Sequence, residues 1–152
     1  MHLSPLDGEI ALSHKLSDSG ARVLVTSNLS ALLPTALKFL AKGRLDRLIV
    51  CEDDSWGKVG TPQTALPDDS RVITFKAFAA GAIKPTQWPA IDVEDVALLQ
   101  YTGGTTGLPK GAMLSHGNLT SAVSIYDIWS APARAERDVL ARVICVLPLF
   151  HI

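Results

Sequence analysis

The stretch Tyr101–Gly111 reads YTGGTTGLPKG and lies between the runs Val96–Gln100 and Ala112–Leu114. Its four glycines let the backbone approach a ligand closely, and their successive amides can point the same way to form an anion-binding nest. Its three threonines add hydroxyl donors, and Lys110 adds a compact positive charge. This chemistry suits a triphosphate. The flanking runs predict strands at 96–101 and 111–115 that pair antiparallel around the loop.

The same residues also fit a plain loop between two strands that binds nothing. Two common nucleotide-binding patterns are absent from the sequence. It has no G-x-x-x-x-G-K-[ST], because Lys110 follows Pro109 and precedes Gly111, and it has no G-x-G-x-x-G. On composition alone, both a phosphate-binding loop and a plain hairpin loop remain open.

The whole string YTGGTTGLPKG resembles the phosphate-loop signature of the adenylate-forming superfamily. That superfamily contains acyl-CoA synthetases, aryl-CoA ligases, luciferases and peptide-synthetase adenylation domains. The last residues, Val146–Ile152 (VLPLFHI), look like the family's next motif, a strand end that carries a Pro and a His near the acyl carboxylate. Leu99, Gln100 and Gly103 are most similar to the long-chain fatty acyl-CoA ligases.

The resemblance implies a ligase that activates a carboxylic acid. A fatty acid carboxylate would attack the α-phosphate of ATP to give an acyl-adenylate and pyrophosphate, and the thiol of coenzyme A would then displace AMP. The implied small molecules are a fatty acid, ATP and coenzyme A, with Mg²⁺ held mostly by residues outside this chain. Two alternatives stay open: an enzyme that adenylates aryl or other carboxylic acids, and a nucleotide-binding module without chemistry of its own.

The resemblance also assigns residues to roles. It implies catalytic roles for Lys110, beside the phosphates, and for His151, which would lie near the carboxylate and α-phosphate or gate the acyl tunnel. It assigns no metal ligand. The residues that it implies in ATP binding all belong to the loop: Tyr101, Thr102, Gly103, Gly104, Thr105, Thr106, Gly107 and Lys110.

The resemblance covers all 152 residues but only a middle part of the family's large amino-terminal domain. The family's later motifs have no counterpart here: the aromatic-Gly-x-Thr-Glu segment, the ribose-binding Asp, the hinge and the catalytic lysine of the carboxy-terminal domain. We therefore expect residues 1–152 to be a partial N-terminal AMP-binding domain that is inactive by itself.

Composition excludes several other classes. Fourteen Lys and Arg against fifteen Asp and Glu give a formal charge of −1, which argues against a nucleic-acid-binding surface. No apolar run reaches the roughly 20 residues that span a membrane, and no signal peptide opens the chain, so we expect a cytoplasmic protein. Peripheral membrane contact of the parent enzyme stays open. Cys51 and Cys145 are expected to pack in the core, and the acidic run Glu52–Asp54 to form a solvated loop.

Alternating helical and apolar segments predict an α/β fold with a mainly parallel sheet flanked by helices. Asp7 is expected to cap the first helix and Gly20 to end it, while Pro34 marks the start or a break of the second helix. A later helix is expected to begin at Ser115 or His116, near enough to the loop for its dipole to favour a phosphate, and to end at Pro132. The predicted parallel strands are 22–26, 47–51, 71–75 and 142–147.

Overall fold

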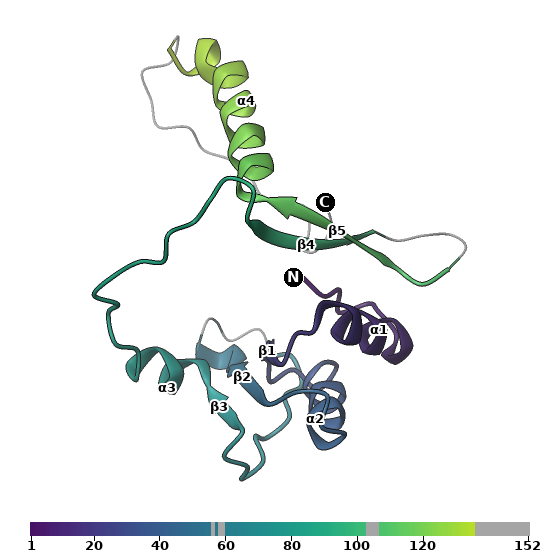
Figure 1. The fold of residues 1–152 in the computed structure, drawn as a ribbon. Coiled ribbons are helices and arrows are strands. Elements are labelled where there is room, and N and C mark those ends of the chain that lie inside the picture. Colours follow the sequence, from purple (N-terminus) through teal and green to yellow (C-terminus); the bar gives the residue numbers. More distant parts are fainter. Residues whose placement is uncertain (56, 58–59, 103–106, 136–152) are drawn as a thin grey trace. The chain divides into compact units, whose positions relative to one another are not determined.

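The computed structural model describes residues 1–55, 57, 60–102 and 107–135 (Figure 1). The chain divides into two compact units. We call Pro5–Trp88 the parallel-sheet unit, and Met1–Ser4 together with Pro89–Ile152 the hairpin unit. The architecture is α/β as predicted, with a three-stranded sheet flanked by helices in the first unit and two antiparallel strands in the second.

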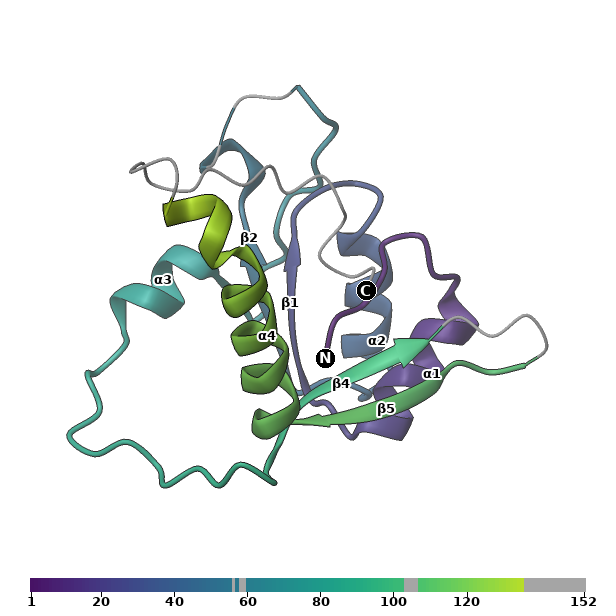
Figure 2. The same cartoon turned by 90° about the horizontal axis from the view of Figure 1, so that it is seen from above.

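The parallel-sheet unit is built around three parallel strands in the order β1-β2-β3, with β2 in the centre. Leu48 of β2 lies level with Leu24 of β1 and Val72 of β3. The helices α2 and α3 lie on opposite sides of this sheet in both views (Figures 1 and 2). The elements are α1 (Glu9–Ser19), β1 (Val23–Ser27), α2 (Leu33–Ala41), β2 (Arg47–Cys51), the 3-10 turn η1 (Asp53–Ser55), β3 (Val72–Thr74) and α3 (Phe75–Ala80).

The core of this unit forms where α2 packs on the sheet. Leu33, Ala36 and Leu40 recur at helical spacing, so they share one face of α2, and all three are buried. They are joined by Leu48 and Val50 of the central strand, neither of which is exposed at all. The most deeply buried side chains are Leu33, Leu40, Leu45, Leu48 and Val50.

In the parallel-sheet unit, the predicted helix ends at Gly20 and Pro34 are confirmed and the one at Asp7 is not. Gly20 ends α1 with a φ of 66°, a left-handed conformation that favours glycine, and Pro34 lies in the first turn of α2. The predicted cap at Asp7 is wrong, because Gly8 caps α1 without a side-chain hydrogen bond. The Asp7 carboxylate instead accepts a hydrogen bond of 2.5 Å from the Nζ of Lys15, a largely buried lysine whose charge needs a partner.

The apolar strand β1 is less buried than its composition suggests. A short, almost wholly apolar strand is typical of one buried on both faces, yet Val23 and Val25 are more than half exposed. Burial on both faces is found instead in β2, where Leu48, Ile49 and Val50 are all buried. Among the strands that the structure describes, β1 has one neighbour and β2 has two, which explains the difference in burial.

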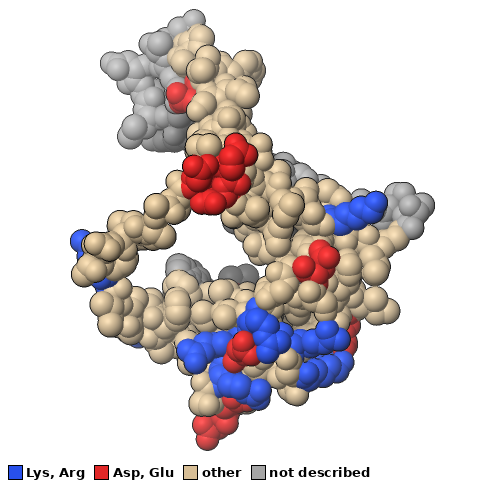
Figure 3. Space-filling view, viewed as in Figure 1, with Lys and Arg blue, Asp and Glu red and all other residues tan. Residues whose placement is uncertain are grey.

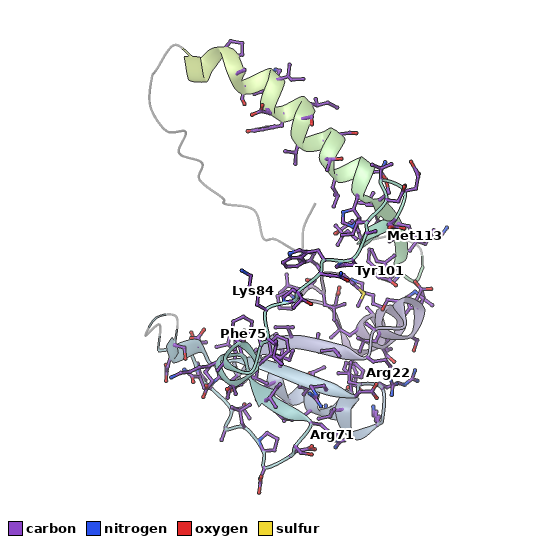
Figure 4. The ribbon with its side chains drawn as sticks, turned by 60° about the vertical axis from the view of Figure 1, so that its left-hand side comes forward. Arg22, Arg71, Phe75, Lys84, Tyr101 and Met113 are labelled. Atoms are coloured by element: carbon purple, nitrogen blue, oxygen red, sulfur yellow. The ribbon has the colours of Figure 1, made fainter. Side chains whose placement is uncertain are left out.

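Basic side chains gather at the edge of the sheet where the strands begin (Figures 3 and 4). Arg22 donates to the carbonyls of Gly43 and Arg44, at 3.0 and 3.2 Å, just after the end of α2. Arg71 donates to the carbonyl of Leu40 within the last turn of that helix, at 3.4 Å. These cations satisfy carbonyl groups at the negative end of the helix dipole, so they stabilise the helix end.

Asp69 is predicted to make the stability of the chain sensitive to acid. Arg71 donates to both of its carboxylate oxygens, at 2.7 and 3.0 Å, and these side-chain hydrogen bonds lower the pKa of Asp69 to about 2. A carboxyl whose pKa is lower in the folded chain stabilises it above about pH 4, and this contribution is lost as the pH falls toward 2. We expect Asp69→Asn to reduce the acid-induced drop in the urea unfolding midpoint between pH 5 and pH 2.5.

The effect of Asp69→Asn on the unfolding midpoint will be small, because water screens both Asp69 and Arg71. The effect should be smaller still in high salt. The exposed neighbour Asp68 provides the control. An Asp69→Asn variant with the same acid sensitivity as Asp68→Asn would show that this pair contributes nothing.

The hairpin unit contains β4 (Val96–Thr102), β5 (Lys110–Ser115) and α4 (His116–Ala135). The two strands pair antiparallel as predicted. The predicted helix end at Pro132 is wrong, because α4 continues to Ala135 with Pro132 inside it. The predicted strand 142–147 lies outside the described residues. No helix in the described part of the chain is long and apolar enough to cross a membrane.

An apolar stripe at helical spacing is typical of a core-facing surface, but the stripe on α4 is exposed. Leu119, Val123, Tyr126 and Trp129 of α4 are between 37% and 77% accessible to solvent. Figure 1 shows α4 extending away from the hairpin beyond its first turns, which leaves this stripe uncovered by β4 and β5.

Candidate functional site

The antiparallel hairpin brings the two ends of the glycine-rich loop together. Thr102, the last residue of β4, lies opposite Lys110, the first residue of β5. The hydroxyl of Thr102 donates to the carbonyl of Lys110 at 3.4 Å. Of the other loop residues in our prediction, Gly103, Gly104, Thr105 and Thr106 lie outside the described residues.

Strand alternation places the hydroxyl and the ammonium on one face of the hairpin. Residues directly opposite each other in an antiparallel pair point to the same side, so Thr102 and Lys110 share a face. Both are exposed. The Lys110 ammonium at the mouth of the glycine-rich loop can bind an oxyanion, and the Thr102 hydroxyl can join it if its proton turns from the Lys110 carbonyl to the ligand.

Gly107 is the described glycine within the loop. A Cβ added to it would meet no atom of the described residues within 4 Å, and its φ lies outside the left-handed region. Packing against the described part of the chain therefore does not explain a glycine at this position.

Tyr101 lies on the opposite face of the hairpin from Thr102 and Lys110, together with its cross-strand partner Gly111. A Cβ at Gly111 would lie 3.1 Å from the Cζ and 3.2 Å from the Cε1 of the Tyr101 ring. The ring thus occupies the space where a side chain at position 111 would stand. The sequence pattern marks Gly111 only as the end of the motif, although a glycine opposite an aromatic residue of the neighbouring strand indicates this packing.

Gln100 precedes this tyrosine and is also buried, with 9% of its surface exposed. Its Oε1 has no hydrogen-bond partner among the described residues. Gln100 shares the face of Thr102, because the two are separated by one residue along β4. A buried polar side chain thus lies on the same face as the hydroxyl and the cation.

The far end of β5 leads directly into α4 through a reciprocal cap. The amide of Ser115 donates to the Oδ1 of Asn118 at 2.9 Å, and the amide of Asn118 donates to the hydroxyl of Ser115 at 3.2 Å. This is a capping box in which Asn replaces the usual Glu or Gln. The next amides donate to the turn before β4, from His116 to Asp95 at 3.0 Å and from Gly117 to Val93 at 2.7 Å.

The amino end of α4 is therefore not available to a phosphate at the loop, contrary to our expectation. Its first amides already have partners in the cap and in the turn before β4. It also lies at the opposite end of β5 from Lys110, and a strand of this length spans about 17 Å. The helix dipole falls off within one turn, so it cannot assist phosphate binding at that distance.

The acidic run Glu52–Asp54 after β2 takes part in hydrogen bonds with nearby loop residues. Asn28, which is buried, accepts a hydrogen bond from the amide of Asp53 at 2.9 Å and donates to the Oε1 of Gln63 at 2.8 Å. Gln63 in turn donates to the Oδ1 of Asp54 at 2.7 Å. No group of three His, Cys, Asp or Glu suited to a metal ion occurs among the described residues.

Cys51 takes no part in this geometry. Cys51 is a free cysteine at the end of β2 and is half-buried, in keeping with a packing role at the edge of the core. His151 and Cys145 lie outside the described residues.

Comparison with known proteins gives relatives across the whole chain. A long-chain-fatty-acid–CoA ligase of Haemophilus influenzae is 32% identical over all of this chain and 29% of its own length. A long-chain-fatty-acid–CoA ligase of Bacillus subtilis is 28% identical over 98% of this chain and 28% of its own length. A feruloyl-CoA synthase of an Amycolatopsis species is 37% identical over 92% of this chain and 22% of its own length.

The chain therefore spans less than a third of the length of these relatives. The sequence profile of the family described as AMP-binding enzyme matches residues 2–152. With a match of this extent, the chain belongs to the AMP-binding enzyme family.

Proposed function

We propose that this chain is part of the N-terminal domain of a long-chain fatty acid–CoA ligase. That enzyme would use ATP to convert a fatty acid to its acyl-adenylate, and would then transfer the acyl group to coenzyme A. The observation that carries the proposal is the hairpin that holds Thr102 opposite Lys110 at the mouth of the YTGGTTGLPKG loop. Membership of the AMP-binding family and the relatives named as fatty acid ligases support it.

In this proposal the loop binds the β- and γ-phosphates of ATP. Thr102 and Lys110 act from one face of the hairpin, and they are joined by the amides and hydroxyls of Gly103, Gly104, Thr105, Thr106 and Gly107. The amides and hydroxyls donate hydrogen bonds, and Lys110 offsets charge that grows as pyrophosphate leaves. Tyr101 belongs to the same motif, but its ring faces Gly111, so we assign it no direct contact with ATP.

The remaining groups of the reaction fall to residues outside the described part of the chain. His151 is proposed to lie near the carboxylate and the α-phosphate, or to gate the acyl tunnel. Since the described residues hold no cluster of carboxylates or imidazoles suited to a metal ion, we assign none of them to Mg²⁺. Mg²⁺ would supply charge neutralisation on the triphosphate. Coenzyme A is the proposed second substrate.

An aryl acid is the second candidate substrate. The feruloyl-CoA synthase relative is 37% identical, a slightly higher identity than the fatty acid ligases show, although over a shorter stretch. The loop geometry does not separate the two, because it concerns the phosphates that both reactions share. A third possibility, a nucleotide-binding module without chemistry, predicts ATP binding without adenylate formation.

The proposal is tested by ATP–pyrophosphate exchange in the full-length protein that contains this chain. Exchange is measured with a series of saturated fatty acids and, in parallel, with ferulate and related aryl acids. We expect long-chain fatty acids to give the highest kcat/KM. Faster exchange with aryl acids would assign the enzyme to the second class, and ATP binding without exchange for any acid would favour the non-catalytic module.

A further inference from the structure

We propose that Tyr101 is a positioning residue, whose ring packs across Gly111 and holds the base of the glycine-rich loop in the geometry that binds ATP. The inference rests on the proposed function, which supplies the ligand of the loop. It concerns one cross-strand pair of the hairpin, one residue before Thr102 and one residue after Lys110.

The packing at this pair is tight. A Cβ at Gly111 would lie 3.1, 3.2 and 3.4 Å from the Cζ, Cε1 and Oη atoms of Tyr101. A Cβ at this position therefore fits only if the ring shifts by a few tenths of an ångström. Only 7% of the surface of Tyr101 is exposed, so the ring has little freedom to move aside. Aromatic residues opposite glycines are known to compensate for the weak strand preference of glycine.

The direction of the ring decides what kind of role Tyr101 can have. Successive residues of a strand point to opposite faces, so the Tyr101 ring lies on the other side of the hairpin from the side chains of Thr102 and Lys110. A ligand bound on their face does not meet the ring. Tyr101 must then act through the backbone, by fixing how β4 and β5 approach each other where the loop begins and ends.

Glycine loses more conformational freedom than other residues when its backbone is fixed, so ordering a glycine-rich sequence around a ligand has a high entropic cost. If the adjoining ends of β4 and β5 are already fixed, less conformational entropy is lost when the ligand binds. A larger fraction of the protein is then competent to bind. Removing the ring should therefore weaken ATP binding in particular. The binding of the carboxylic acid, which does not use this loop, should change much less.

The test is a double-mutant cycle in the full-length protein, with pyrophosphate exchange measured against ATP concentration at saturating acid. The loss of a cross-strand aromatic contact should raise the KM for ATP about fivefold in Tyr101→Ala. Gly111→Ala should also raise it, because the new Cβ displaces the ring. In the double variant, Gly111→Ala should add nothing, since no ring remains to be displaced. Tyr101→Phe should keep a KM for ATP nearer to that of the wild type than Tyr101→Ala does, because it keeps the ring atoms Cζ and Cε1 that lie over Gly111.

Met113→Ala is the matched control, because Met113 lies on the same face of the hairpin two residues along β5 and is 71% exposed (Figure 4). A KM for ATP in Tyr101→Ala equal to that of Met113→Ala would overturn the positioning role, and so would a lower melting temperature with an unchanged KM for ATP. Strict additivity in the cycle would show that the ring and the glycine act separately, which also contradicts the inference. An inactive wild-type protein would instead refute the proposed function.

Discussion

Lys110→Ala should slow pyrophosphate exchange by roughly ten- to a hundredfold in the full-length protein at saturating fatty acid. Lys110 supplies a fixed positive charge at the mouth of the loop, opposite Thr102. In the proposed reaction it faces phosphate charge that increases as pyrophosphate leaves, and a charge-assisted contact of this kind is worth about 1.5–3 kcal/mol. Formation of the thioester from a supplied acyl-adenylate does not involve the departing phosphates, so it should be much less affected.

Lys84→Ala provides the control for the loss of one exposed lysine. Lys84 lies in an exposed connecting segment outside the hairpin (Figure 4). The Lys84→Ala variant should catalyse pyrophosphate exchange at the wild-type rate. If Lys110→Ala matches Lys84→Ala, then Lys110 is only a solvated residue of the hairpin, and the assignment of the loop to phosphate binding loses its main support.

Leu48→Ala should lower the free energy of unfolding of the 152-residue chain by about 2–5 kcal/mol. Leu48 lies in β2, between β1 and β3, and none of its side chain is accessible to solvent. Truncation removes buried apolar surface and leaves a cavity that a central strand, held on both sides, cannot close. The measurement is the urea unfolding midpoint, followed by far-UV circular dichroism.

The matched control is Val25→Ala in the neighbouring strand. Val25 is 55% exposed, so its truncation should cost less than about 1 kcal/mol. Equal losses for the two variants would mean that β2 is not the centre of the core in solution. Loss of cooperative unfolding in Leu48→Ala alone would agree with the expectation, because a loss of this size is a large fraction of the stability of a small unit.

Local sequence determined the elements of this chain, because their signals lie within a few residues. The apolar run at β2, the left-handed glycine at Gly20 and the proline at the start of α2 each act through their own backbone preferences, and the structure places them as predicted. The antiparallel strands around the loop were also predictable, since a turn-rich stretch between two strand-like runs favours a hairpin.

Other features were decided by tertiary contacts that no local pattern encodes. Asp7 is a good helix cap by its residue type, but the buried ammonium of Lys15 competes for the same carboxylate and binds it. The amino end of α4 has the amides of a phosphate site, but the turn before β4 already uses them. The face on which Tyr101 lies depends on the register of the two strands, because a shift of one residue would exchange the faces. The sequence therefore identifies the residue types of the motif. Only the paired strands show that Thr102 and Lys110 lie on one face of the hairpin and Tyr101 and Gly111 on the other.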